Sequence, residues 1–275
     1  MTKVPNSRRN LDDAIRRVAG FDAGYVRART VIANAIVGQM LPDGVVKGGS
    51  ALKLRFGDAG TRFTADLDVA RGSALADYVG KLDERLAEGW CGFTGKLVEC
   101  RPAKPKGVPS HYVMQPFDVK LSYLGKSWLT VSLEIGHDEI GDADEVEMGL
   151  APDVAELFGK VGLPQPGPVP LMPLHHQVAQ KFHALTELGS ERAHDLVDLQ
   201  IIIANTRLDL AKTNETCKRL FSYRRAQPWP SKVVKGEGWD GLYSGRADGL
   251  PVMQDVDDAV EWANALVDSI TSAGS

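Results

Sequence analysis

The sequence predicts an α+β fold in which a mixed sheet flanked by helices is followed by a mainly helical C-terminal domain. Three observations lead to this prediction. Strand-like segments with alternating apolar residues all lie before about residue 135, a proline-rich stretch follows, and only helical periodicity comes after it. We therefore expect an α/β domain with N-terminal helices at 1–162, a linker at 163–173 and a helical domain at 174–275.

Bulk composition narrows the class of protein. The 275 residues are 43% apolar and carry a net charge of -4, which is ordinary for a folded enzyme and does not indicate a general nucleic-acid binder. No run of about 18 apolar residues and no signal peptide is evident, so we expect a cytoplasmic protein without a membrane partner. The three cysteines lack the spacing of a zinc cluster or a disulfide framework.

The N-terminal half alternates helices and strands. Two helices are expected within the first 40 residues, followed by a turn and a short strand that enters a glycine pair and a short helix. Further strands are expected at 61–70, 92–99, 112–123 and 127–135, and a helix is expected at 74–88. Beyond the linker, helices are expected at 175–188, 191–204, 208–223 and 255–272, with a long ordered loop at 227–251.

Two aspartates share one face of the strand predicted at 61–70. Its odd-numbered residues are mostly apolar, so Asp66 and Asp68 point together to the polar face. Two such carboxylates repel each other unless a cation lies between them, which favours a magnesium or manganese site. A third carboxylate on a neighbouring strand would complete a two-metal site. Glu134 has the right context for it, and Asp118 is the alternative.

The turn at Gly48, Gly49 and Ser50 favours phosphate binding. Glycines let the backbone approach a triphosphate closely, and the serine supplies both an N–H and a hydroxyl. Neither G-x-x-x-x-G-K-[ST] nor G-x-G-x-x-G occurs, so a P-loop and a Rossmann dinucleotide site are not indicated. Combined with the aspartates, the turn indicates phosphoryl or nucleotidyl transfer.

Charged residues cluster again after the proline-rich stretch. Lys181 is flanked by apolar residues and is suited to neutralise a triphosphate in a cleft between the domains. The alternative is an ion pair that ties two helices together, made by Lys181 or Arg192 with Asp195 or Asp198.

Basic residues form two patches that are candidates for RNA contact. One comprises Arg101, Lys104 and Lys106. The other, which we prefer because aromatic residues are interleaved with it, spans 212–235 and includes Phe221, Tyr223 and Trp229. A solvated helix face is the alternative reading of the second patch.

The motifs together resemble a known family. Lys47 to Leu52, followed by Arg62 to Asp68, is similar to the first signature of the AbiEii/AbiGii-type toxin nucleotidyltransferases, which include the MenT toxins. Lys181 and the segment 192–199 are similar to the second signature, and the resemblance spans about residues 25–205. Departures are Thr64 in place of serine, Val69 in place of an aromatic residue, and His194 in place of arginine.

The resemblance implies a DNA polymerase β-type core that transfers nucleotides from NTP to an RNA 3′ end, notably the tRNA acceptor stem, and so inhibits translation. Expected partners are NTP, tRNA and a cognate antitoxin protein, and the expected cofactor is magnesium or manganese. The implied catalytic residues are Asp66, Asp68, Lys181 and Asp195, with metal on Asp66 and Asp68; Glu134 joins them as a metal ligand on the strand pattern described above. The implied nucleotide-binding residues are Lys47, Gly48, Gly49, Ser50, Arg62, Thr64 and Lys181.

Two other functions remain open at this point. One is a nucleotidyltransferase of the same fold that modifies a small molecule, such as an antibiotic, or a protein hydroxyl. The other is a non-catalytic module that binds NTP without turnover.

Overall fold

The structure is a computed structural model that describes residues 3–102 and 113–274. Lys104 and Lys106 of the first basic patch lie outside the described residues. The chain forms two compact units: the first takes in the residues up to 59 together with 63–172, and the second comprises 60–62 and 173–275. Among the described residues, none of the helices is long and apolar enough to span a membrane.

A mixed sheet organises the first unit, as the sequence predicts. The strand order is β3-β4-β5-β2-β1-β7-β6. β2 is parallel to β5 and β1 is parallel to β7, whereas the other neighbouring strands are antiparallel. The strands are β1 (Val45–Lys47), β2 (Leu67–Arg71), β3 (Phe93–Glu99), β4 (Gln115–Tyr123), β5 (Lys126–His137), β6 (Glu147–Gly149) and β7 (Val169–Leu171).

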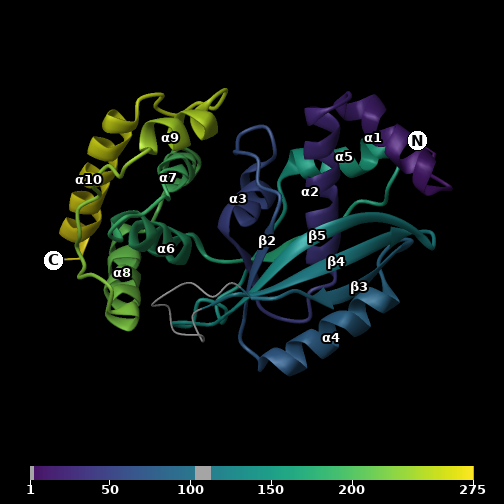
Figure 1. Cartoon of the computed structure of the whole chain (residues 1–275), viewed down its shortest axis with the longest axis horizontal. Helices are drawn as coiled ribbons and strands as arrows, with labels where there is room; N and C mark the ends of the chain where they lie inside the picture. The colour runs from purple at the N-terminus through teal and green to yellow at the C-terminus, as the bar shows by residue number, and fades with distance from the viewer. Residues whose placement is uncertain (1–2, 103–112, 275) are drawn as a thin grey trace. The chain divides into compact units, whose positions relative to one another are not determined.

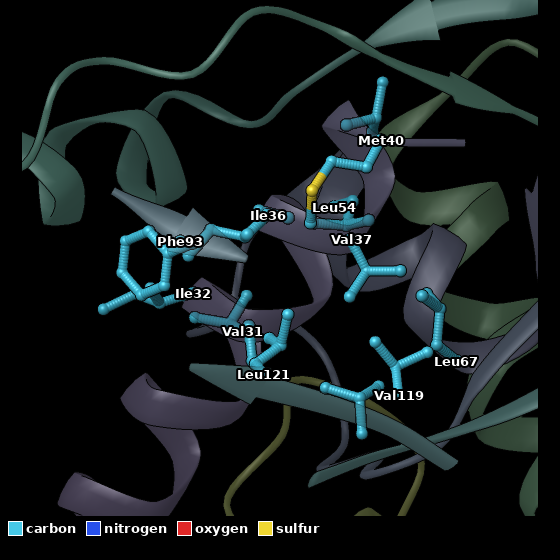
Figure 2. Packing of buried hydrophobic residues seen from close by; sticks show 14 of the residues in the cluster. Val31, Ile32, Ile36, Val37, Met40, Leu54, Leu67, Phe93, Val119 and Leu121 are labelled. Carbon is cyan, nitrogen blue, oxygen red and sulfur yellow. The ribbon is translucent and has the colours of Figure 1, made fainter. Parts of the chain in front are cut away.

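One face of this sheet is apolar and packs against helices. Figure 2 shows Val119 and Leu121 of β4 in the same cluster as Val31 and Ile36 of the second helix. Each such buried aliphatic side chain contributes about 1.5–3 kcal/mol. Because side chains alternate along a strand, the intervening residues of β4 and β5 project to the other face, and most of them are polar. The polar face is therefore left for chemistry.

Helices of the first unit surround this sheet in the part of the chain that the structure describes. They are α1 (Arg8–Ala19), α2 (Ala23–Gln39), α3 (Gly48–Phe56), α4 (Leu75–Glu88) and α5 (Pro152–Val161). α1, α2 and α5 pack on one another, while α4 lies along β3 (Figure 1). The sequence prediction omitted α5, although Pro152 at its first turn and the left-handed Gly162 at its end are ordinary helix boundaries.

The strand expected at 61–70 is shorter than predicted. β1 ends at Lys47, the register partner of Asp68, and the chain then turns into α3. Residues 61–66 therefore have no β1 neighbour and form no regular strand. Side chains of α3 bond this segment instead: the Ser50 hydroxyl donates to the carbonyl of Asp66, and the Lys53 ammonium donates to that of Thr64.

The proline-rich segment 163–173 contains a strand of the sheet. Val169–Leu171 forms β7, which pairs with β6 along its length and with β1 through Leu171. Val169 and Leu171 are fully buried. The first unit accordingly extends to Met172.

Helices make up the second unit. They are α6 (Leu174–Thr186), α7 (His194–Asn205), α8 (Leu210–Arg224), α9 (Trp239–Ala247) and α10 (Val256–Ala273) (Figure 1). The prediction of a loop at 227–251 is wrong where α9 forms. Its buried residues are spaced by four, and the Trp239 indole donates to the carbonyl of Ser190 at 2.6 Å. Glycines within and before this helix weaken its intrinsic helix propensity and hid the pattern.

Candidate active site

The sheet register aligns three charged residues across adjacent strands. Lys47 of β1 is the direct partner of Asp68 of β2, and Asp68 is the direct partner of Glu134 of β5. Adjacent strands lie about 4.8 Å apart and paired residues point to the same face, so these side chains are neighbours on the polar face. Asp118 pairs with Ser132 of β5 and lies one strand further away. Glu134 is thus the carboxylate next to Asp68.

Asp66 lies just before β2 and is exposed to solvent. Ser50, whose side chain is almost fully buried, holds the backbone of Asp66 in place. The Ser50 hydroxyl donates to the Asp66 carbonyl and accepts a hydrogen bond from the Asn34 amide at 3.2 Å. The sequence led us to expect this hydroxyl on a phosphate. In the structure it positions the segment that carries Asp66, because a buried hydroxyl requires partners.

Gly48 begins α3 directly beside the carboxylate of Asp68. Its φ is +67°, and a Cβ added there would lie 2.5 Å from Asp68 Oδ2. Only glycine adopts this backbone without strain and leaves room for the carboxylate. The N–H groups of Gly48, Gly49 and Ser50 are in the first turn of α3, where amides have no intrahelical acceptor and the helix dipole favours an anion.

Replacing this glycine tests the close approach. We expect Gly48→Ala to lower catalytic turnover by on the order of 10²-fold, because displacing a positioned group by about 1 Å has this effect. Gly80→Ala in α4 is the matched control, since a Cβ there meets nothing within 4 Å. Steady-state kinetics of both variants with circular dichroism would check this. Equal turnover in both variants would contradict a tight fit at Gly48.

Lys47 reaches across the polar face towards β5. A Cβ added at Gly136 would lie 3.1 Å from the Lys47 Nζ. Lys47 also acts on Asp142, which is 1% exposed. Burial and a hydrogen bond with Asp138 raise the pKa of Asp142 to about 7, although the Lys47 charge opposes this rise. Lys47 therefore belongs to the row of charged residues and also acts electrostatically on a buried acid.

The raised pKa of Asp142 makes stability depend on pH. The pKa of Asp142 is higher in the folded state than the ordinary carboxyl value of 3.8. Its contribution to stability is therefore fully present below pH 3.8 and is lost as the pH rises through about 7. We expect Asp142→Asn, which stays neutral, to gain stability relative to the parent between pH 5 and pH 8, as measured by urea unfolding. The exposed Asp144→Asn serves as the control. A gain that is independent of pH would contradict the assignment.

The oxygen donors of the row fit a hard divalent cation. Carboxylate oxygens are the ligands that Mg²⁺ and Mn²⁺ prefer, and Asp66, Asp68 and Glu134 supply them on one accessible face. Over residues 3–102 and 113–274, no three His, Cys, Asp or Glu side chains are gathered as a ready metal site. Mg²⁺ commonly binds through one or two carboxylates together with substrate phosphates, and such a site needs no protein cage.

In the second unit, Lys181 is the centre of a buried ion-pair network. Its Nζ lies 2.8 Å from Asp195 Oδ1 and 2.6 Å from Asp198 Oδ2, and its side chain is only 6% exposed. Arg62 binds both oxygens of Asp198, at 2.8 and 2.9 Å. Arg192 contacts the other oxygen of Asp195 at 3.0 Å. The structure therefore contains the ion pairs between α6 and α7 that the sequence offered as the alternative role of Lys181.

Charge interactions set the protonation of this network. Burial would raise the pKa of Asp195, but the Lys181 ammonium and the Arg192 guanidinium outweigh it and hold that pKa well below its ordinary value. The pKa of Asp198 is lowered too, by Lys181 and Arg62 against burial. Burial lowers the pKa of His194 to about 4, with Arg62 and Arg192 adding to the effect. His194 is thus neutral at pH 7, and its neighbouring carboxylates are ionised.

The aromatic residues of the second basic patch are largely packed away. Phe221 is buried, and its ring lies 5.1 Å from that of Trp229, which also contacts Phe182. Lys235 is paired with Asp240 at 2.8 Å and with Asp257 at 2.9 Å. The Phe221 ring is therefore not displayed for stacking on bases, and the Trp229 ring is only partly exposed. Exposed basic side chains remain on α8, namely Lys212, Lys218 and Arg219, and at Arg225, which directly follows the helix.

Comparison with known proteins decides the family. Residues 33–265 match the family model described as nucleotidyl transferase AbiEii toxin of type IV toxin–antitoxin systems. The chain belongs to this family. As an AbiEii member it is a nucleotidyltransferase, so a module that binds NTP without turnover is no longer an alternative. The match includes both signatures on which the resemblance was based.

A solved structure shares the AbiEii fold seen here. MenT4, a nucleotidyltransferase toxin from Mycobacterium tuberculosis, is 17% identical, with a TM-score of 0.51 over 98% of this chain and 99% of that chain. The predicted fold class is thus confirmed. A search of curated protein sequences returned no match.

Several residues around the AbiEii motifs were not singled out by sequence reasoning. Asn34 bonds Ser50 from α2, and Lys53, which is 1% exposed, bonds the backbone of Thr64 from α3. Asp142 lies close to Lys47. Ser50 and Lys53 are three residues apart and so lie on one face of α3. This spacing predicts that both side chains contact the same neighbouring segment.

Proposed function

We propose that this AbiEii nucleotidyltransferase acts in the cytoplasm and transfers nucleotides from an NTP to the 3′ end of RNA, at the tRNA acceptor stem, and so inhibits translation. The observation that carries the proposal is the row formed by Lys47, Asp68 and Glu134 beside the N-terminus of α3. It combines an anion-binding helix end with accessible carboxylates, which are the two requirements of nucleotidyl transfer.

In this proposal, the triphosphate lies against the first turn of α3. Gly48 and Gly49 admit its oxygens to the backbone amides, and Lys47 adds a positive charge. Asp66, Asp68 and Glu134 would hold magnesium or manganese, and the ion would supply Lewis-acid stabilisation of the charge that develops in the transition state. Ser50 and Lys53 keep the segment before β2 in place through the carbonyls of Asp66 and Thr64.

The reaction is an in-line displacement at phosphorus. The RNA 3′-oxygen forms a bond to the α-phosphorus, the bond from the α-phosphorus to the bridging oxygen breaks, and pyrophosphate leaves. The proton of the 3′-hydroxyl is released, so that RNA and NTP give RNA extended by one nucleotide, pyrophosphate and H⁺. No covalent bond to the protein forms, and the side chains only bind and orient.

Lys181, Asp195 and Arg62 receive a positioning role in this proposal. Their charged atoms already bond within the second unit, where Asp195 and Asp198 neutralise Lys181. Thr64 contributes through its backbone carbonyl. The roles of Lys181 and Asp195 in transfer rest on their match to the second signature of the family.

RNA phosphates are proposed to contact α8. Lys212 and Lys218 are exposed on this helix and Arg225 directly after its end, and lysine and arginine provide the salt-dependent part of nucleic-acid affinity. We expect reversal of Lys218 and Arg225 to glutamate to weaken tRNA binding and flatten its salt dependence, while NTP affinity stays unchanged. Equal tRNA binding by the variant and the parent would remove α8 from the proposal.

A transfer assay with competing acceptors tests the proposed substrate. Each α-labelled NTP is incubated with the protein, Mg²⁺ and one of total tRNA, an aminoglycoside or a mixture of proteins. Label is expected in tRNA and should be lost when the 3′-terminal nucleotides are removed. Label in the antibiotic or in protein, with none in tRNA, would instead support the small-molecule or protein-modifying function. Expression without an antitoxin should arrest growth.

A further inference from the structure

A separate cavity lies at the opposite end of β1 from Gly48. Its volume is about 640 Å³, which is within the range of small-molecule sites. It is bounded by residues 41–44, which lead into β1, and by residues 72–73, which follow β2. Because β1 spans three residues, the cavity is about 10 Å from the row of Lys47 and Asp68. The proposed transfer reaction therefore does not account for it.

The charged part of the lining is acidic. Asp43 and Asp144 line the cavity, and no lysine, arginine or histidine does so among the described residues. Asp144 belongs to the segment 138–147, which has six carboxylates and no lysine or arginine. Of the others, Glu147 is paired with Arg55 at 2.5 Å, and Asp138 accepts backbone N–H groups. Asp43 and Asp144 are therefore the carboxylates that line the cavity.

Asp43 has an unsatisfied oxygen. Its Oδ2 accepts a hydrogen bond from the Ser73 hydroxyl at 2.9 Å, but its Oδ1 is shielded from solvent and has no hydrogen-bond donor. The nearby Arg71 and Arg85 donate to the backbone carbonyls of Ser73 and Leu41. An unpaired carboxylate oxygen is costly. Asp43 as a whole is only half-buried and lines the cavity, so a cationic group there would offset its charge.

The rest of the lining is apolar and partly exposed. Val146 is 45% exposed and Met148 is 59% exposed, and both line the cavity with Pro168 and Pro170. Such a wall suits a carbon chain, because covering it removes apolar surface from water. The cavity therefore has an acidic end and an apolar wall.

We propose that this cavity binds an alkylammonium or alkylguanidinium group, with the cationic head at Asp43 and Asp144 and the carbon chain along Val146 and Met148. A free aliphatic diamine and the lysine or arginine side chain of an extended peptide both carry this group. A peptide would differ from a diamine in that its backbone could also pair with β6, which is the last strand of the sheet.

Calorimetric titration of the full chain distinguishes these sources. The probes are hexane-1,6-diamine, its neutral analogue hexane-1,6-diol, and a blocked pentapeptide with a central lysine or, as its control, norleucine. Titrations are made at about 0.15 M salt, where distant exposed charges are screened. Binding of the diamine alone identifies a small-molecule site, and at least tenfold tighter binding of the lysine peptide identifies a peptide site.

Substitutions assign the binding to the cavity. Asp43→Asn and Asp144→Asn are each expected to weaken binding of the cationic probe at least fivefold. Glu145→Gln, which removes the same charge from the same segment outside the lining, should leave it unchanged. Asp144 is exposed, so its variant remains informative if Asp43→Asn fails to fold. Absence of binding by both cationic probes, or equal binding by all variants, would overturn the proposal.

Discussion

Asp66→Asn and Asp68→Asn are each expected to lower the rate of nucleotide transfer by on the order of 10³-fold or more, because in the proposed mechanism each removes a carboxylate charge that would hold the metal. Neither side chain is buried, so folding should be preserved. Rates measured with saturating NTP and increasing Mg²⁺, together with thermal unfolding, would check both points. Retained transfer in either variant would contradict the assignment.

The sheet supplies a matched set of controls for this prediction. Glu134→Gln should also impair transfer, because Glu134 is the register partner of Asp68. Asp118→Asn removes the same charge from the same face but one strand further away, and its rate should remain within about threefold of the parent, as is usual for a surface change. A greater loss of transfer rate in Asp118→Asn than in Glu134→Gln would assign the role of third carboxylate to Asp118 instead.

Lys181→Met is expected to destabilise the second unit by about 3–5 kcal/mol, since removing one partner of a buried ion pair leaves an uncompensated charge. Here Asp195 loses its buried counter-ion, and Asp198 keeps only Arg62. Urea unfolding of the variant would measure the loss. Adding Asp195→Asn to Lys181→Met should recover part of it, because the double variant buries one charge fewer.

Arg192 offers the comparison for Lys181. It contacts the same Asp195, but its side chain is 54% exposed. Arg192→Met should therefore cost no more than about 1 kcal/mol, as exposed ion pairs do. Equal destabilisation by the two substitutions would show that burial does not set the strength of these pairs. A folded Lys181→Met that has lost transfer would support the role of Lys181 in the reaction.

The sequence predicted the elements that have strong local signals. Alternating residues located β4 and β5, and helical periodicity located α6, α7, α8 and α10 close to their observed bounds. The shared face of Asp68 and Glu134 followed from the same alternation. The register between strands, which makes Glu134 rather than Asp118 the neighbour of Asp68, depends on long-range pairing and is not encoded in the local pattern.

Features that depend on tertiary contacts have no local signal in the sequence. β7 is three residues long and lies among prolines, so its strand character appears only through pairing with β1 and β6. Ser50 was assigned to phosphate because local composition cannot show that its hydroxyl is buried against the carbonyl of Asp66. Lys181 was expected to contact substrate, yet its ammonium is bonded to two aspartates that come from a different helix.

The mass of tRNA before and after incubation with the protein, NTP and Mg²⁺ tests the central claim most directly. We expect the mass of intact tRNA to increase by one or more nucleoside monophosphate units. Fragment analysis should place the added units on the 3′ terminus, and the increase should be absent with Asp68→Asn. Unchanged tRNA mass after incubation with the folded parent protein and all four NTPs would contradict the account.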